Sequence, residues 1–116
     1  MKTECRTYLR YATLLSLLLA AVFVLNGCTN PEKAKAQHLS RGEAYLKDGK
    51  FQEASIEFRN AIQIDDRLAA AHWGLARAYE GLQRFQELFD ELRKATQLDP
   101  NNFEARIKLG TLFLSA

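Results

Sequence analysis

Residues 69–102 of the chain read AAAHWGLARAYEGLQRFQELFDELRKATQLDPNN, and residues 35–68 before them read KAQHLSRGEAYLKDGKFQEASIEFRNAIQIDDRL. At an offset of 34 residues, the two segments carry the same amino acid at 12 of 34 positions, among them a histidine, an Ala-Tyr pair and a Phe-Gln-Glu run. A third copy starts at residue 103 and continues to residue 116. Such a fixed period is typical of repeat proteins, in which each copy forms one supersecondary unit and neighbouring units share a core.

Each copy carries apolar residues at the spacing of amphipathic helices, with turn residues between them. Gly49 predicts a left-handed helix end between the two helices of the first copy. Pro100 and the two asparagines after it predict a helix stop and the N-cap of the next helix. From these signals we expect helices at residues 34–48, 52–64, 69–82, 86–98 and 103–115.

Small residues stand at positions 42, 76 and 110, where we expect two helices to approach closely, and aromatic residues stand between the helices. This pattern resembles the tetratricopeptide repeat, a helix-turn-helix unit of 34 residues. The resemblance rests on Gly42, Tyr45, Phe51, Ala54, Phe58 and Ala61 in the first copy and on Leu75, Ala76, Tyr79, Phe85, Ala95 and Pro100 in the second. It implies an all-α fold of helical hairpins in a short right-handed solenoid, with repeats at residues 34–68 and 69–102 and the first helix of an incomplete third repeat at 103–116.

An apolar segment precedes the repeats and has the organisation of a signal peptide. Three basic residues, Lys2, Arg6 and Arg10, stand before an apolar run at residues 12–25. This run is shorter than the about 20 apolar residues that cross a bilayer core. We therefore predict a signal peptide at residues 1–27, with an uncleaved single-pass anchor as the alternative.

The end of this segment, Leu25-Asn26-Gly27-Cys28, resembles the lipobox of bacterial lipoproteins. The resemblance implies signal cleavage between Gly27 and Cys28 and a lipid on the Cys28 thiol. Residues 28–33 would then be the lipidated cysteine and a polar tether to the repeats. Thr29 follows the cysteine in place of an aspartate, which implies the outer membrane, with the protein facing the periplasm.

Composition argues against several other functions. The whole chain carries a net charge of +2, and removal of residues 1–27 leaves 13 basic and 13 acidic side chains, so a nucleic-acid interface has no electrostatic support. The sequence shows no Gly-rich phosphate loop and no recognisable pair of nucleophile and base. His38 and His72 repeat at the same offset, which repeat packing explains better than a shared metal ion. We expect no enzyme activity, cofactor, metal ion or small-molecule substrate.

Tetratricopeptide repeats bind peptides in a concave groove lined by the first helix of each hairpin. The resemblance places nine residues of this chain there: Leu39, Glu43, Leu46, Trp73, Arg77, Glu80, Ile107, Lys108 and Thr111. Trp73 is the candidate anchor because an indole buries a large area, and simple packing between helices is the alternative. Leu39 and Glu43 stand where relatives that clamp a carboxylate have Lys and Asn, so we expect no clamp for a chaperone tail. Arg77 and Lys108 either meet an acidic partner segment or form a solvated face.

These features predict a lipid-anchored scaffold for protein-protein interaction in the bacterial envelope. The arrangement is similar to that of repeat lipoproteins that accompany exopolysaccharide export and exosortase protein sorting. Pilotin lipoproteins of type IV pilus assembly are one alternative, and a docking arm of a longer enzyme is an alternative of another class. The third copy lacks a second helix, which would leave Leu109, Leu112, Phe113 and Leu114 partly exposed. The sequence is then a fragment of a longer array, or its last helix pairs with another molecule.

Overall fold

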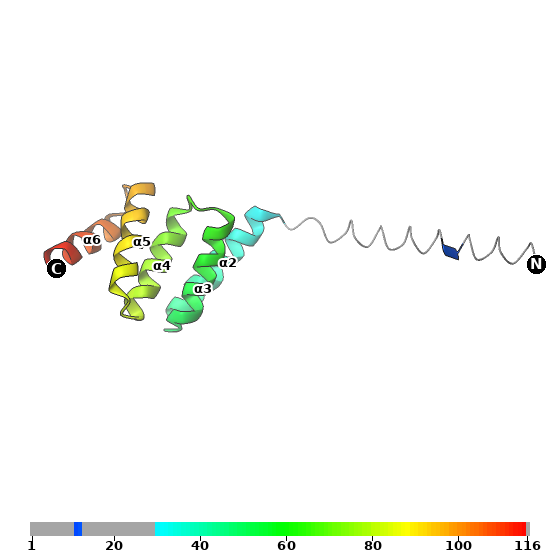
Figure 1. Cartoon of the computed structure of the whole chain (residues 1–116), viewed down its shortest axis with the longest axis horizontal. Helices are drawn as coiled ribbons and strands as arrows, with labels where there is room; N and C mark the ends of the chain where they lie inside the picture. The colour runs from blue at the N-terminus through cyan, green and yellow to red at the C-terminus, as the bar shows by residue number, and fades with distance from the viewer. Residues whose placement is uncertain (1–10, 13–29, 116) are drawn as a thin grey trace, which may run out of the picture. The chain divides into compact units, whose positions relative to one another are not determined.

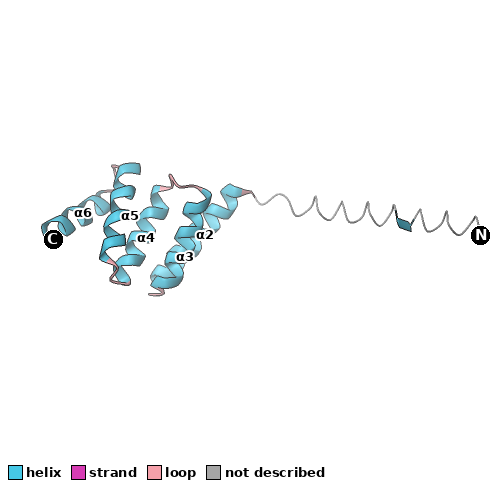
Figure 2. Ribbon diagram, in the orientation of Figure 1, coloured by secondary structure: helices cyan, strands magenta, loops and turns pink. Residues whose placement is uncertain are grey.

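The computed structural model describes residues 11–12 and 30–115, and Pro31–Ala116 form a compact unit of their own. Within the described part of this unit lie the helices α2 (Pro31–Lys47), α3 (Phe51–Ile64), α4 (Ala69–Gly81), α5 (Phe85–Leu98) and α6 (Phe103–Ser115). Figure 1 shows them following one another as antiparallel hairpins, and Figure 2 shows the short loops that join them. The predicted all-α fold of helical hairpins is confirmed.

The predicted signal peptide and lipidation site, including Gly27 and Cys28, lie outside the described residues. Among the described helices, none has both the length and the apolar character needed to cross a bilayer. The first helix begins at Pro31, three residues earlier than we predicted, so residues 31–33 are helical and do not belong to a tether. Proline is favoured at the first helical position because its fixed φ suits the helix and its missing N–H would be unpaired there.

The turns inside the two hairpins have the same geometry although their sequences differ. In the first turn Gly49 has a φ of 71°, as predicted, and the Lys50 N–H donates to the Tyr45 carbonyl at 2.9 Å. In the second, Gln83 has a φ of 57°, and the Arg84 N–H donates to the Tyr79 carbonyl at 2.9 Å. This bond from the residue after the left-handed position closes the helix end in both repeats. The repeat packing therefore holds a glutamine in a conformation that usually selects glycine.

The loop between the second hairpin and α6 is built as the sequence predicts. The Asn102 side-chain oxygen accepts the Ala105 N–H at 3.0 Å and caps the helix. One turn earlier, the Asp99 carboxylate accepts the Asn101 N–H at 3.0 Å. Asp65 accepts the Arg67 N–H in the same way at 3.1 Å in the preceding repeat. The Asn102 bond satisfies a backbone donor that the start of α6 leaves without a partner, and the two aspartate bonds hold the turns before α4 and α6.

A single aromatic ring joins the first three helices at the centre of the core. Phe58 on α3 is fully buried, and its ring lies against both Gly42 on α2 and Gly74 on α4. A Cβ atom added to Gly42 would come within 2.8 Å of this ring, and one added to Gly74 within 2.3 Å. At position 42 the tight contact is therefore made by a side chain and not by a second helix backbone. At Gly110, the equivalent position of α6, an added Cβ would meet nothing within 4 Å, so the close approach predicted at position 110 is wrong.

Burial differs sharply along the array. Helix α4 packs against α3 and α5 and contacts α2, while α6 packs on α5. The last helix accordingly keeps its apolar residues partly in contact with solvent: Phe113 is 65% exposed and Leu114 is 91% exposed, as predicted. Leu109 and Leu112 are half-buried and pack against the core. The Phe113 ring meets Phe89 on α5 edge to face, with centroids 5.1 Å apart.

Candidate partner-binding groove

A cavity of about 670 Å³ is lined mainly by α4 and α6, with further residues from α2, α3 and α5. Helical spacing explains its walls, because residues 73, 77 and 80 share one face of α4 and residues 104, 107, 108 and 111 share one face of α6. Its volume falls within the ~300–1,000 Å³ of typical binding pockets. We call it the groove cavity. It is lined by Leu46, Phe51, Trp73, Arg77, Glu80, Phe85, Leu88, Glu104, Ile107, Lys108, Thr111 and Leu112.

The structure brings seven of the nine predicted groove residues together in this cavity: Leu46, Trp73, Arg77, Glu80, Ile107, Lys108 and Thr111. The other two, Leu39 and Glu43, lie on α2 away from its lining. Leu39 packs against the buried core, and Glu43 is engaged by Arg77. The cavity therefore centres on the second and third repeats.

Five further residues line the cavity and were not predicted from the sequence: Phe51, Phe85, Leu88, Glu104 and Leu112. Phe51 and Phe85 open the second helix of their hairpins and occupy the same position of the repeat, so the 34-residue period was the signal that could have found them. Phe51 lies against Gly81 of α4, while Phe85 is 59% exposed. The second helix of each hairpin thus contributes its first residue to the groove, although we predicted a groove lined by the first helices alone.

Trp73 combines the two roles that the sequence left open. It is half-buried and packs against the hydrophobic core, and it also lines the groove cavity. The Arg77 guanidinium lies over the indole, 5.9 Å from the ring centroid. This packing holds the indole at the cavity wall, so a ligand that contacts it would need little further ordering of the side chain.

Ion pairs link the first helices of successive repeats across the groove. Arg77 on α4 donates to both carboxylate oxygens of Glu43 on α2 at 3.1 Å. Lys108 on α6 donates to Glu80 on α4 at 2.6 and 2.5 Å. Both cations that we had considered for an acidic partner are therefore engaged within the chain. In residues 30–115, the third acidic residue at this surface, Glu104, makes neither an ion pair nor a side-chain hydrogen bond.

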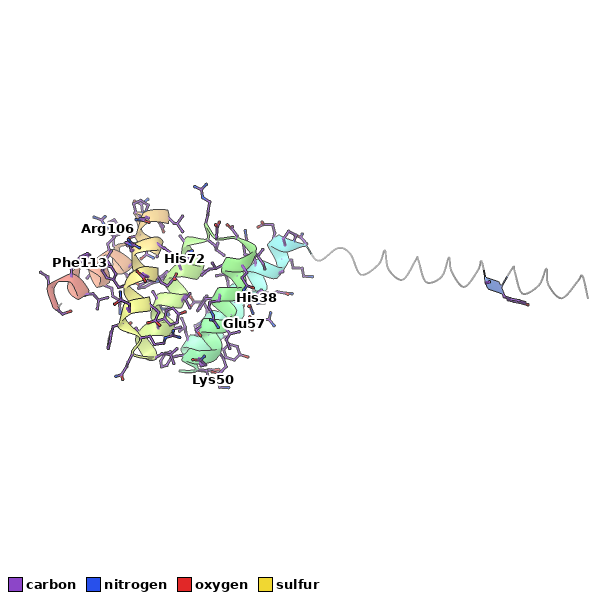
Figure 3. The ribbon with its side chains drawn as sticks, in the orientation of Figure 1. His38, Lys50, Glu57, His72, Arg106 and Phe113 are labelled. Atoms are coloured by element: carbon purple, nitrogen blue, oxygen red, sulfur yellow. The ribbon has the colours of Figure 1, made fainter. Side chains whose placement is uncertain are left out.

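Behind the groove, the two repeated histidines each pair with a glutamate of the following helix. His38 Nδ1 lies 2.7 Å from a Glu57 carboxylate oxygen, and Figure 3 labels this pair on α2 and α3. His72 Nδ1 lies 2.5 Å from Glu91, and its Nε2 lies 2.9 Å from the Asp66 carbonyl. Glu57 and Glu91 are 34 residues apart like the histidines, so the period contained this signal too. The pairs support the predicted packing role of the histidines.

The second pair is almost enclosed. Side-chain exposure is 4% for His72 and 13% for Glu91, against 21% and 15% for His38 and Glu57. The hydrogen bond with Glu91 raises the pKa of His72, although burial acts against it. Burial works to raise the pKa of Glu91, but the His72 hydrogen bond and the Lys94 charge lower it below its ordinary value. Because both His72 nitrogens face acceptors, the imidazolium satisfies the site best.

The described part of the chain offers little for metal chemistry. Across residues 11–12 and 30–115, no three His, Cys, Asp or Glu side chains converge as a metal site requires. The chemical character of the groove cavity instead comes from aromatic and aliphatic side chains with a few paired charges. Such a surface suits a polypeptide segment.

Comparison with known proteins supports this interpretation. Residues 38–67 and 69–112 each match a family profile described as tetratricopeptide repeat. The solved TPR domain of OM64 from Arabidopsis superposes with a TM-score of 0.65 and 28% sequence identity, over 67% of this chain. The chain covers 64% of the length of that domain. No curated protein matches the chain. Repeats of this family are modules that bind peptide or protein partners and are typically not catalytic.

Proposed function

We propose that this chain, a short array of tetratricopeptide repeats, is a lipid-anchored scaffold that holds a segment of another bacterial envelope protein in its groove cavity. The observation that carries the proposal is the groove cavity itself, where Trp73, Phe85 and Ile107 meet in about 670 Å³. Phe85 and Ile107 are 59% and 68% exposed. Large apolar side chains gathered around a concavity are characteristic of interaction sites.

The anchoring part of the proposal rests on the sequence before the repeats. The apolar run at residues 12–25 ends in Gly27-Cys28, and Thr29 follows. Lipidation of Cys28 would place the repeats next to the membrane, because α2 begins at Pro31. In this position the groove would meet partners of the outer membrane or periplasm, and support of exopolysaccharide export or protein sorting is the role we favour.

Replacement of the groove tryptophan tests the binding function. We expect Trp73→Ala to weaken crosslinked capture of the partner from envelope membranes by about 2 kcal/mol, or roughly thirtyfold in affinity, because a central aromatic anchor is lost. Phe113→Ala is the matched control, since Phe113 is 65% exposed and does not line the groove cavity. Circular dichroism verifies that both variants keep their helices. Equal capture by the two variants would contradict a groove function for Trp73.

The anchor is tested separately by mass spectrometry of the native N-terminus. We expect the mature chain to begin at Cys28 with diacylglycerol on sulfur, and Cys28→Ser to abolish both the lipid and the cleavage. A chain that retains Met1 and an unmodified Cys28 would refute the anchor without affecting the groove.

A further inference from the structure

The charges of the groove cavity determine which partner segments it can accept. Among its lining residues, two are basic, Arg77 and Lys108, and two are acidic, Glu80 and Glu104. Arg77 is neutralised by Glu43 from α2, and Lys108 by Glu80 from α4. One negative charge, Glu104, is left without a counter-charge in the described part of the chain. The cavity and its ion-pair partners therefore carry a net charge of minus one.

The position of this remaining charge is well defined. Glu104 lies in the first turn of α6, one helical turn before Ile107. Ile107 is 68% exposed and lines the same cavity. Residues three apart on a helix lie on the same face. A ligand side chain that packs on Ile107 therefore lies about one helical turn from a carboxylate that can pair with a cation.

We infer that the groove cavity binds an apolar segment that carries a Lys or Arg close to its apolar anchor. This inference rests on the proposed groove function and names the chemistry of the partner. The apolar side chains of the segment pack on Trp73, Phe85 and Ile107, and its cation pairs with Glu104. An acidic segment would place its charge beside Glu104 and would have to displace Glu43 or Glu80 from its ion pair.

The chain contains its own reporter for this binding. Trp73 is the only tryptophan of the sequence and lines the cavity, so its fluorescence reports occupancy directly. The full chain, reconstituted in nanodiscs of uncharged phosphatidylcholine, is titrated with three synthetic helical peptides. They share the same leucines and alanines and differ only in carrying lysine, glutamine or glutamate one turn from the central leucine. Empty nanodiscs correct for peptide that binds lipid.

We expect the lysine peptide to bind best, the glutamine peptide next and the glutamate peptide least, with about fivefold in Kd between the two charged peptides. Glu104→Gln should bring the lysine peptide to the affinity of the glutamine peptide. Glu53→Gln is the matched control, because Glu53 also lies in the first turn of a helix but does not line the cavity. This control should keep the full preference.

The outcomes separate the inference from the function on which it rests. Binding in which the glutamate peptide equals or exceeds the lysine peptide overturns the inferred chemistry and leaves the groove function in place. A preference that Glu53→Gln removes as completely as Glu104→Gln also overturns it, because the preference would then come from overall charge. If Trp73 fluorescence responds to none of the peptides, both the inference and the groove function fail.

Discussion

Helices α4 and α6 are both the first helix of a repeat, yet one is enclosed and the other is open. Seven of the thirteen residues of α4 are buried, whereas Ala105 is the buried residue of α6 within its described part. The equivalent positions 76 and 110 show the contrast, since Ala76 is fully buried and Gly110 faces open space. Burial in this fold therefore depends on how many helices flank a residue as much as on its own hydrophobicity.

Substitutions at Gly74 in α4 and at Gly110 in α6 should give the largest difference in the free energy of unfolding. Gly74→Leu should lower the free energy of unfolding by about 3 kcal/mol or more, because the Phe58 ring cannot retreat from α4 without moving into Gly42. Gly110→Leu should raise it by about 0.5–1 kcal/mol, because leucine is the better helix former and its Cβ would meet no other atom within 4 Å. Urea denaturation followed by circular dichroism measures both. Similar losses in the two variants would mean that a helix covers Gly110 in solution.

The next largest difference in stability should come from His72, the buried histidine of α4. Its equivalent in α6 is Arg106, which lies over the Phe103 ring and is exposed (Figure 3). We expect His72→Ala to cost about 2 kcal/mol, because the mostly buried Glu91 carboxylate loses its hydrogen bond to His72 and keeps only the more exposed Lys94 as a partner. Arg106→Ala should cost less than about 0.5 kcal/mol. A loss at His72 as small as that at Arg106 would show that solvent reaches Glu91 in the native protein.

The same pair makes stability depend on pH. Because the pKa of His72 is raised above its ordinary 6.5, the charged imidazolium stabilises the fold fully below that pH, and this contribution is lost as pH rises through the raised value. Unfolding free energies should therefore fall from slightly acidic to alkaline pH in the wild type. The His72→Ala variant should lack this component of the decline, and an unchanged profile would contradict the assignment.

The ion pairs that join successive first helices should have the smallest effects. Arg77→Gln and Lys108→Gln should each cost less than about 1 kcal/mol, because all four side chains are about a third or more exposed and screened by water. Double-mutant cycles with Glu43→Gln and Glu80→Gln measure the two pairs at low and high salt. A coupling above this range for Glu80 and Lys108 alone would show that the open helix depends on its ion pair more than the enclosed one does.

The fold was predictable from sequence because the 34-residue repeat indicates where each helical hairpin lies. The repeated Ala-Tyr and Phe-Gln-Glu segments placed every hairpin, and Gly49 and Asn102 placed a turn and a cap. The helix start at Pro31 was missed, although proline is well suited to the first helical position. Local signals of this kind require no knowledge of tertiary contacts.

The groove was harder to predict because it depends on contacts between repeats. The period identified Trp73 and Ile107, but it could not show that Arg77 reaches back to Glu43 and that Leu39 packs inward. Leu39 and Glu43 of the first repeat occupy the same repeat positions as Trp73 and Arg77 of the second, yet neither of them lines the cavity. Ion pairs between helices of different repeats determine which charged side chains of the groove can still pair with a ligand. The position of a residue within its repeat does not determine this.

The Phe58 ring has a consequence for how the array unfolds. Repeat arrays often behave as linear chains of units, each with its own stability and a term for each interface. Here the second helix of the first hairpin presents one ring to Gly42 in its own repeat and to Gly74 in the next, so intrinsic and interfacial stability reside in the same side chain. We therefore expect the two complete hairpins to unfold as a single cooperative unit, and α6, in whose described part Ala105 is the buried residue, to fray before them.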